Sequence, residues 1–128
     1  MCLNIKKNQK PRIAKRDITV YKTVDHDEDD TFRTVWYDAI VKIGEEYTSK
    51  LILQNDNISE IVTEALHSFS NLEEATADAE DDALVLVKCI IPKGSIYYKG
   101  RDCFNNQSYA SNKLKYAKII KDYPNYGI

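Results

Sequence analysis

Hydrophobic and polar positions along the chain form short segments, rich in β-branched and aromatic residues, that predict a β-sheet. The clearest is the nearly continuous apolar run ALVLVKCII at residues 83–91. Its length and β-branching indicate a central strand buried on both faces. Further strands are predicted at residues 17–24, 33–43, 47–53, 95–98 and 113–120. A turn at Gly44 and Glu45 favours a hairpin between residues 33–43 and 47–53.

Two other segments follow helical spacing. Residues 70–82, SNLEEATADAEDD, predict a helix in which Ser70 is the N-cap and Glu73 completes a capping box. At residues 58–69, apolar side chains also recur at helical spacing, and Asn57 with Glu60 matches a second capping box. Read locally, both segments are helices.

These elements predict one α+β domain over residues 1–128, a mostly antiparallel, twisted sheet of about five or six strands with one or two packed helices. Residues 1–16 are expected to form a basic N-terminal arm and residues 121–128 an irregular tail. Residues 25–30 are expected to form an acidic loop and residues 101–112 a polar loop. Beside the central strand, the predicted core residues are Ile18, Val20, Val35, Leu51, Leu53 and Leu114.

The composition is that of an ordinary globular chain, but its charge is uneven. The 128 residues are 43% hydrophobic and 30% charged, with a net charge of -2. Basic residues dominate up to Lys22 and from Lys88 onward, and acids dominate between them. If the two ends lie side by side in the sheet, they form a basic face that attracts an anion. The alternative is that the charges only solvate separate faces.

Cysteine and histidine positions argue against a disulfide framework or a bound metal. Cys2, Cys89 and Cys103 have no regular spacing, and His26 and His67 stand apart from any cysteine pair. Cys89 is expected to be a buried small hydrophobe, and no metal or cofactor is expected. The start MCLNIKKNQK lacks the apolar region of a signal peptide, and no run reaches the roughly eighteen apolar residues of a membrane span. We therefore expect a cytoplasmic location and no membrane partner.

A group of cations and aromatic rings follows the break at residues 92–94. Its members are Lys93, Tyr97, Tyr98, Lys99 and Arg101. Rings stack on bases and cations neutralise phosphate, so this combination is typical of a nucleotide or phosphate ligand. The alternative is a tyrosine-rich strand with ordinary lysines on its solvated side.

Lys22, His67 and Ser68 are assigned to the same predicted ligand site, on the hypothesis that they converge with that strand. His67 and Ser68 also suit a base and a nucleophile, but no third group is spaced to orient the base, which favours a structural histidine. Residues 25–30 lack the glycine and distal glutamate of an EF-hand, which favours a solvated loop over a Ca²⁺ site. There is no P-loop or GxGxxG motif, and a pI of about 5.7 argues against a polynucleotide partner.

Three segments together resemble a group of small uncharacterised proteins of gut bacteria and their phages. They are PRIAKRDITVYK, ALHSFSNLEEA, and VKCIIPKGSIYYKG with the following SYASNKL. The start, with Met1, Cys2, Leu3, Ile5 and Lys6, fits the same group. The resemblance implies a short accessory gene of phage or mobile-element type, and it favours an extended segment over a helix at ALHSF, residues 65–69.

A looser resemblance links the chain to the ADP-ribosyltransferase fold. VYK at residues 20–22 falls where that family carries an arginine or histidine, HSFS at residues 67–70 falls at its serine motif, and YASNKL at residues 109–114 falls on its final strand. Lys22 stands in place of the arginine, and no glutamate follows Glu80 to supply the catalytic carboxylate. The resemblance therefore implies a nucleotide pocket without transferase catalysis.

These observations predict a non-enzymatic binding protein, a phage or mobile-element accessory factor of anti-defence type. Its expected partner is a small nucleotide-like ligand or a host protein. The alternative is an ADP-ribosyltransferase-like enzyme acting on NAD. The absence of any motif that specifies a reaction favours the binding protein, and the oligomeric state is left open by the sequence.

Overall fold

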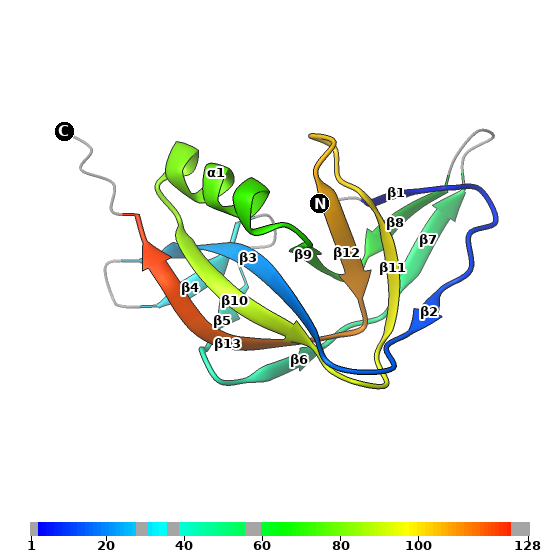
Figure 1. Ribbon diagram of the computed structural model, residues 1–128, viewed down its shortest axis with the longest axis horizontal. Coiled ribbons are helices and arrows are strands. Elements are labelled where there is room, and N and C mark those ends of the chain that lie inside the picture. Colours follow the sequence, from blue (N-terminus) through cyan, green and yellow to red (C-terminus); the bar gives the residue numbers. More distant parts are fainter. Residues whose placement is uncertain (1–2, 28–30, 36–38, 56–59, 124–128) are drawn as a thin grey trace.

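The computed structural model describes residues 3–27, 31–35, 39–55 and 60–123, which form a curled antiparallel sheet with one helix packed on it (Figure 1). The described residues contain 13 strands in a single sheet, so the prediction of five or six strands with one or two packed helices is wrong. Several predicted strands and loops are divided into shorter strands by turns. The strands are β1 (Leu3–Ile5), β2 (Arg12–Ile13), β3 (Ile18–His26), β4 (Phe32–Thr34), β5 (Ile40–Val41), β6 (Glu46–Thr48), β7 (Ile52–Asn55), β8 (Glu60–Glu64), β9 (Leu66–Phe69), β10 (Val85–Ile91), β11 (Ile96–Arg101), β12 (Gln107–Ser111) and β13 (Lys113–Asp122).

Strand β10 is the buried strand that the apolar run predicts. It pairs with β3 on one edge and with β13 on the other, and most of its side chains are buried. Cys89 is fully buried, as expected. The basic N-terminal and C-terminal parts of the chain therefore meet β10 on neighbouring strands, as the central-strand interpretation requires.

A gap opens in the sheet beside β3. One edge of β3 pairs with β10 along most of its length. The opposite edge meets β9 only at Tyr21 and Phe69, and then meets β4 from Val24 onward. Between these two contacts lie Lys22 and Thr23, where neither β9 nor β4 is in register with β3. This interruption positions the candidate site.

Buried side chains gather in three clusters. The largest lies between β3, β10 and β13, and includes Val20, Val87 and Leu114. A second packs β1, β8 and β11 together, and the third lies beneath the helix. Of the predicted core residues, Val20 and Leu114 are fully buried, whereas Val35 and Leu53 are 42% and 37% exposed. Leu53 lies on β7, the strand at one end of the sheet, and Val35 directly follows β4.

The helix α1 (Leu72–Asp82) confirms the prediction for residues 70–82, with its cap shifted by one residue. Asn71, not Ser70, is the N-cap, because its side-chain oxygen accepts hydrogen bonds from the backbone N–H groups of Glu73 and Glu74. Ala75 and Ala79 pack the helix onto the sheet. Within the described part of the chain, no helix is long and apolar enough to cross a membrane.

The second predicted helix is wrong. Residues 60–64 form β8 and residues 66–69 form β9, and residues 56–59 lie outside the described residues. Strand β8 is inserted between β1 and β7, where Val62 pairs with Leu3 on one side and with Leu53 on the other. Pairing on both edges outweighs the local helical spacing. The extended conformation favoured for residues 65–69 is found in β9.

The basic N-terminal segment contributes strands in place of the expected arm. Leu3 and Ile5 of β1 are buried, and β1 pairs with both β8 and β11. Gly100 permits this pairing, because a Cβ atom there would lie 2.2 Å from the backbone oxygen of Asn4. Strand β11 therefore runs through Gly100 and does not end before it.

The predicted hairpin of residues 33–43 and 47–53 is also wrong. Residues 33–43 are divided between β4 and β5, which pair with each other, while residues 36–38 lie outside the described part. Strand β6 pairs with β13, and β7 pairs with β8. Residues 33–43 and 47–53 therefore do not pair with each other: β4 with β5 and β7 with β8 pair with their neighbours along the chain, and β6 pairs with the distant β13.

Three predicted irregular segments contain strand residues. The polar loop of residues 101–112 includes β12, which joins β9 to β11. The tail begins later than expected, because β13 continues to Asp122, and residues 124–128 lie outside the described residues. Of the acidic loop, Asp25 and His26 belong to β3, and residues 28–30 lie outside the described part.

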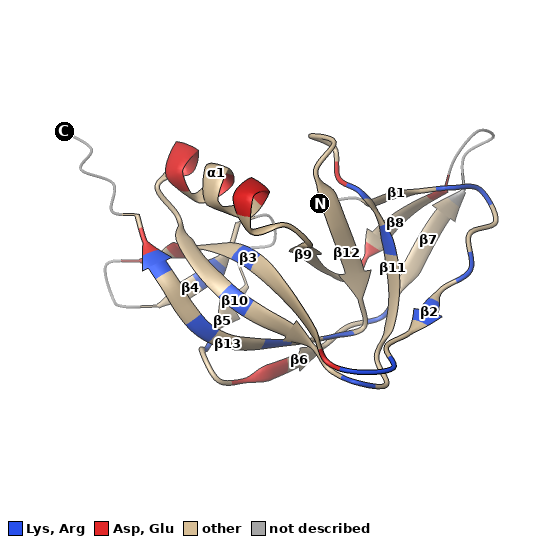
Figure 2. Cartoon of the chain, in the orientation of Figure 1, with Lys and Arg blue, Asp and Glu red and all other residues tan. Residues whose placement is uncertain are grey.

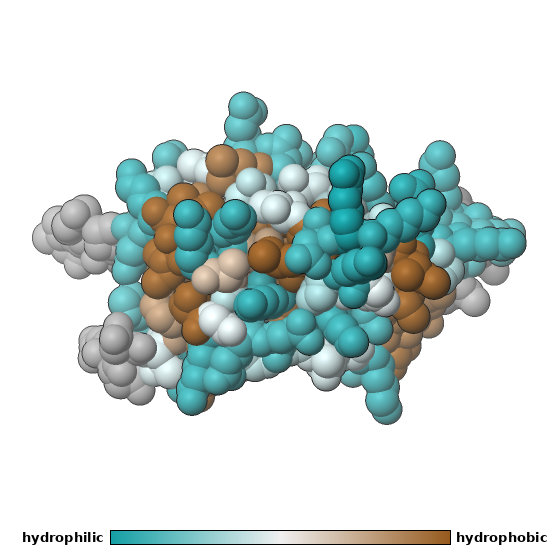
Figure 3. Space-filling view, turned by 60° about the horizontal axis from the view of Figure 1, so that its bottom comes forward, coloured by the Kyte–Doolittle hydropathy of each residue, from teal (hydrophilic) through white to brown (hydrophobic). Residues whose placement is uncertain are grey.

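Some large hydrophobic side chains remain exposed on several elements, among them Ile13, Phe104 and Ile120. On the face seen in Figure 3, hydrophobic residues form separate areas with hydrophilic residues between them. This face therefore presents no single continuous apolar surface.

Candidate functional site

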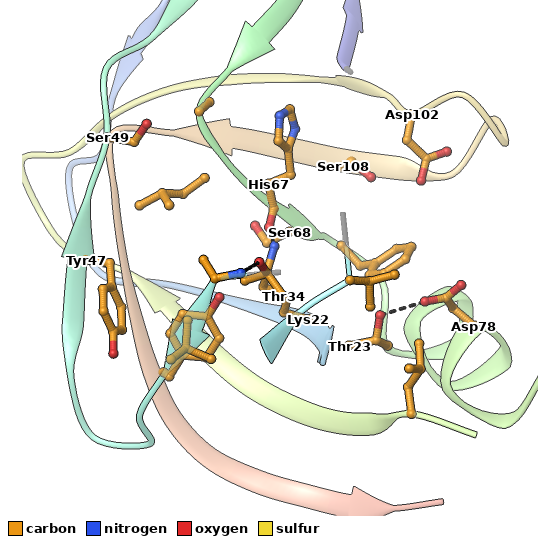
Figure 4. Close-up of a pocket in the computed structure, with 18 of the residues that line it drawn as sticks. Lys22, Thr23, Thr34, Tyr47, Ser49, His67, Ser68, Asp78, Asp102 and Ser108 are labelled. Carbon is orange, nitrogen blue, oxygen red and sulfur yellow. Dashed lines mark hydrogen bonds between the residues drawn. The ribbon is translucent and has the colours of Figure 1, made fainter. Parts of the chain in front are cut away.

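A cavity of about 690 Å³ lies at the gap beside β3 and is called the groove below. It is lined by β3, by the β4–β5 hairpin, by β6, by β8 and β9, and by the turn that joins β11 to β12. Figure 4 shows its polar lining residues converging from these elements. They include Lys22, Thr34, Ser49, His67, Ser68 and Asp102.

Lys22 supplies a positive charge to the groove. It lies between the buried Val20 and Val24 on one face of β3, opposite Val87 of β10. Its ammonium group donates a hydrogen bond of 2.7 Å to the backbone oxygen of His67. Burial lowers the pKa of Lys22, as expected for a cation taken out of water.

No carboxylate of the described residues pairs with Lys22. The ion pairs found there join His26 to Asp122 and Arg33 to Asp27. The neighbouring thiol of Cys89 does not supply an anion either, because burial raises its pKa to about 12. Lys22 therefore has no counter-ion among the described residues, and an anion bound beside its amino group would favour the charged ammonium form.

His67 and Ser68 carry two buried polar atoms without partners. Each residue is only 4% exposed, and neither Nε2 of His67 nor Oγ of Ser68 has a hydrogen-bond partner among the described residues. Burial, and then the charge of Lys22, lower the pKa of His67 to about 3, so its ring is neutral at pH 7. Buried polar atoms are nearly always satisfied. These two atoms therefore lack, among the described residues, the partner that a buried polar atom normally has.

The arrangement does not suit a serine nucleophile activated by the adjacent histidine. Successive side chains of a strand point to opposite faces. His67 lies opposite Ala110 of β12, and Ser68 lies opposite Tyr109. Figure 4 shows the ring of His67 directed away from the hydroxyl of Ser68. Both residues line the groove, but the pair lacks the geometry of a base and its nucleophile.

One wall of the groove is acidic. Asp78 and Asp82 come from α1, and Asp102 comes from the turn after β11. The hydroxyl of Thr23 donates a hydrogen bond of 2.6 Å to Asp78, which ties the helix to the strand that carries Lys22. Figure 2 shows acids on α1 and basic residues on the strands beneath it. The groove therefore contains charges of both signs.

The two predicted aromatic residues do not line the groove. Tyr98 is buried among the side chains that join β1, β8 and β11. The ring of Tyr97 packs edge-on against Tyr109, with 5.5 Å between the ring centroids. Both tyrosines pack against other side chains of the protein. A role of either one in ligand binding stays a prediction.

The predicted cations after the break also lie outside the groove. Lys93 occupies the turn before β11, where its backbone N–H donates a hydrogen bond to Asp17. Arg101 donates one to the backbone oxygen of Asn105. Lys99 borders a separate, shallow basic hollow that it shares with Lys6, Lys7, Asn8, Gln9, Lys10 and Arg12. The structure thus brings Lys22, His67 and Ser68 together and leaves the other predicted site residues elsewhere.

The remaining polar lining residues have no local sequence signal. Thr34, Ser49 and Asp102 each occur in a segment of ordinary turn or strand composition. Only the pairing of distant strands brings them to one cavity. Among the described residues, no three histidine, cysteine, aspartate or glutamate side chains are grouped in a way that could hold a metal ion.

Comparison of the chain with known protein families, with curated proteins and with solved structures finds no match. The groove must therefore be interpreted from its own chemistry.

Proposed function

We propose that the protein is a non-enzymatic binding protein that holds a small ligand with an anionic group in the groove beside Lys22. The observation that carries the proposal is the amino group of Lys22, which has no counter-ion among the described residues and donates to the backbone of His67, beside side-chain atoms of His67 and Ser68 that lack partners in the same part of the chain. An anionic group accepts from Lys22 and from the Ser68 hydroxyl, and the neutral ring of His67 donates or accepts according to its tautomer.

Binding is favoured over catalysis by the relation between the two residues of β9. A strand places His67 and Ser68 on opposite faces, so the ring is not positioned to remove the hydroxyl proton. Each residue lines the groove and has a polar side-chain atom without a partner among the described residues, which supports hydrogen bonding to a ligand over proton transfer between the two.

One observation supports the alternative of an ADP-ribosyltransferase-like enzyme. The first two segments that resemble that fold lie on β3 and β9 and the third begins on β12, and these three strands are consecutive in the sheet, although the third segment ends in β13. The missing glutamate still counts against turnover of NAD. Incubation of the protein with NAD, followed by measurement of free nicotinamide, tests the alternative, because an enzyme of this kind releases nicotinamide and a binding protein does not.

The biological setting is proposed on the resemblance to proteins of gut bacteria and their phages. On that basis the protein acts in the cytoplasm as an accessory factor of a phage or mobile element. A nucleotide-like ligand and a host protein are both compatible with that role. The calorimetry described next distinguishes between these two kinds of partner.

Hexanoate is expected to bind the wild-type protein, and Lys22→Met is expected to weaken its binding about tenfold or more. The reason is that a hydrogen bond from a charged donor contributes roughly 1.5–3 kcal/mol. Isothermal titration calorimetry with hexanoate, inorganic phosphate, AMP and NAD measures the affinities. The matched control is Lys88→Met, because Lys88 lies on the neighbouring strand β10, is also partly buried and does not line the groove.

Equal affinities of wild-type protein and Lys22→Met would contradict the groove as the site. Binding of AMP or NAD that depends on Lys22 would identify a nucleotide-like ligand. If none of these compounds binds, the proposal of a small anionic ligand fails, and a host protein becomes the favoured partner.

A further inference from the structure

We infer that the ligand of the groove is a zwitterion, with a carboxylate at Lys22 and a cationic group against the acidic wall of Asp78, Asp82 and Asp102. This inference rests on the proposed function, because it takes Lys22 as the binding point of the anionic end. It adds a second binding point and a direction for the ligand.

The acidic wall carries negative charge without a basic partner. The ion pairs of the described residues lie elsewhere, so none of Asp78, Asp82 and Asp102 pairs with a lysine or arginine there. Asp102 is only 3% exposed, and it accepts hydrogen bonds from the backbone N–H groups of Phe104 and Asn106. These neutral donors position the carboxylate but leave its charge uncompensated.

Asp78 joins the wall to the strand that carries Lys22. Its carboxylate accepts the Thr23 hydroxyl, and Thr23 follows Lys22 directly in β3. Burial raises the pKa of Asp78, the hydrogen bond from Thr23 opposes that rise, and the nearby charges of Asp82, Asp102 and, least, Asp81 add to it. A cation placed here relieves the repulsion among these carboxylates.

The groove therefore contains both a lysine, which favours an anionic group, and an acidic wall, which favours a cationic group. A simple cation is attracted by the wall and repelled by Lys22, whereas a polyphosphate is attracted by Lys22 and repelled by the wall. A ligand with one charge of each sign is attracted both by Lys22 and by the acidic wall. The unpartnered atoms of His67 and Ser68, each in a residue that is 4% exposed, add uncharged hydrogen-bonding groups to the same cavity.

Three compounds of matched length test the inference. These are 6-aminohexanoate, hexanoate and hexylamine, which carry both charges, the anion only and the cation only. Calorimetry on the full chain is expected to show that 6-aminohexanoate binds about tenfold more tightly than hexanoate, and that hexylamine binds most weakly. Asp78→Asn is expected to reduce the preference for 6-aminohexanoate over hexanoate to about twofold or less.

The control is Asp81→Asn, because Asp81 lies on the same helix but does not line the groove. It is expected to retain the preference. If Asp78→Asn does not fold, Asp82→Asn carries the same test. Equal affinities for hexanoate and 6-aminohexanoate, both dependent on Lys22, would overturn the zwitterion and leave the proposed function intact. An equal loss of preference in Asp81→Asn would also overturn it, and absence of binding by all three compounds would overturn both.

Discussion

Acidification from pH 7 to pH 4 is expected to lower the free energy of unfolding of the wild-type protein by about 3 kcal/mol more than that of His67→Gln. Burial, and then the charge of Lys22, lower the pKa of His67 in the folded protein to about 3, from 6.5 for the free side chain. Below pH 6.5 the unfolded chain therefore takes up a proton that the folded chain does not. The resulting stability is fully present above pH 6.5 and is lost as the pH falls toward 3.

Urea unfolding at pH 7, 5.5 and 4 measures the effect. The two proteins are compared by how steeply the free energy of unfolding changes with pH. This comparison removes the contribution of the carboxylates, because they titrate in both proteins. His26→Gln is the matched control, since His26 is the other histidine of the chain and lies outside the groove. Parallel pH dependence of wild-type protein and His67→Gln would show that His67 is not held neutral by its surroundings.

Gly100→Ala is expected to destabilise the protein by about 3 kcal/mol and to release β1 from the sheet. The added Cβ atom would lie 2.2 Å from the backbone oxygen of Asn4, which a small side-chain movement does not relieve. Displacement of β1 would also expose Leu3 and Ile5, which are buried in the native sheet. Urea unfolding gives the loss of stability, and amide hydrogen exchange in residues 3–5 shows whether β1 is released.

Gly44→Ala is the control for the effect of replacing a glycine. Gly44 has a φ of +96°, but no atom lies within 4 Å of the position of an added Cβ. Its substitution therefore adds backbone strain of about 1 kcal/mol without a clash. If Gly100→Ala is no more destabilising than Gly44→Ala, and if β1 keeps its protected amides, the close approach of β1 and β11 is wrong.

The sequence predicts best those elements whose formation depends on their own residues. The run at residues 83–91 is apolar except for Lys88, so it indicates a buried strand before its partners are known. The helix at residues 72–82 has both an apolar face and a capping residue. In each case local composition and tertiary environment favour the same structure.

The short strands are predicted poorly, because their partners determine them. Strand β8 has helical spacing, but it is held between β1 and β7, which come from different parts of the chain. The sequence of β12 is typical of a polar loop, but the segment is a strand because it pairs with β9 on one edge and with β11 on the other. The number of strands and their order follow from these long-range pairings, which a single sequence does not show.

The candidate site shows the same limit. Lys22 and His67 are 45 residues apart in the sequence, and the hydrogen bond between them depends on the single point where β3 meets β9. Residue chemistry selects these two side chains as candidates, but it also selects Tyr98 and Arg101, which the fold places elsewhere. Asp78 and Asp102 are not selected, since an aspartate in a helix or a turn is ordinary on a protein surface.

The most direct test of the binding site is a titration of ¹⁵N-labelled protein with 6-aminohexanoate, followed by NMR. Our account predicts saturable shifts at the amides of Lys22, His67 and Ser68 and at the ring nitrogen Nε2 of His67. Shifts confined to the basic hollow around Lys6 and Lys99, or no saturable shift at any concentration, would contradict it.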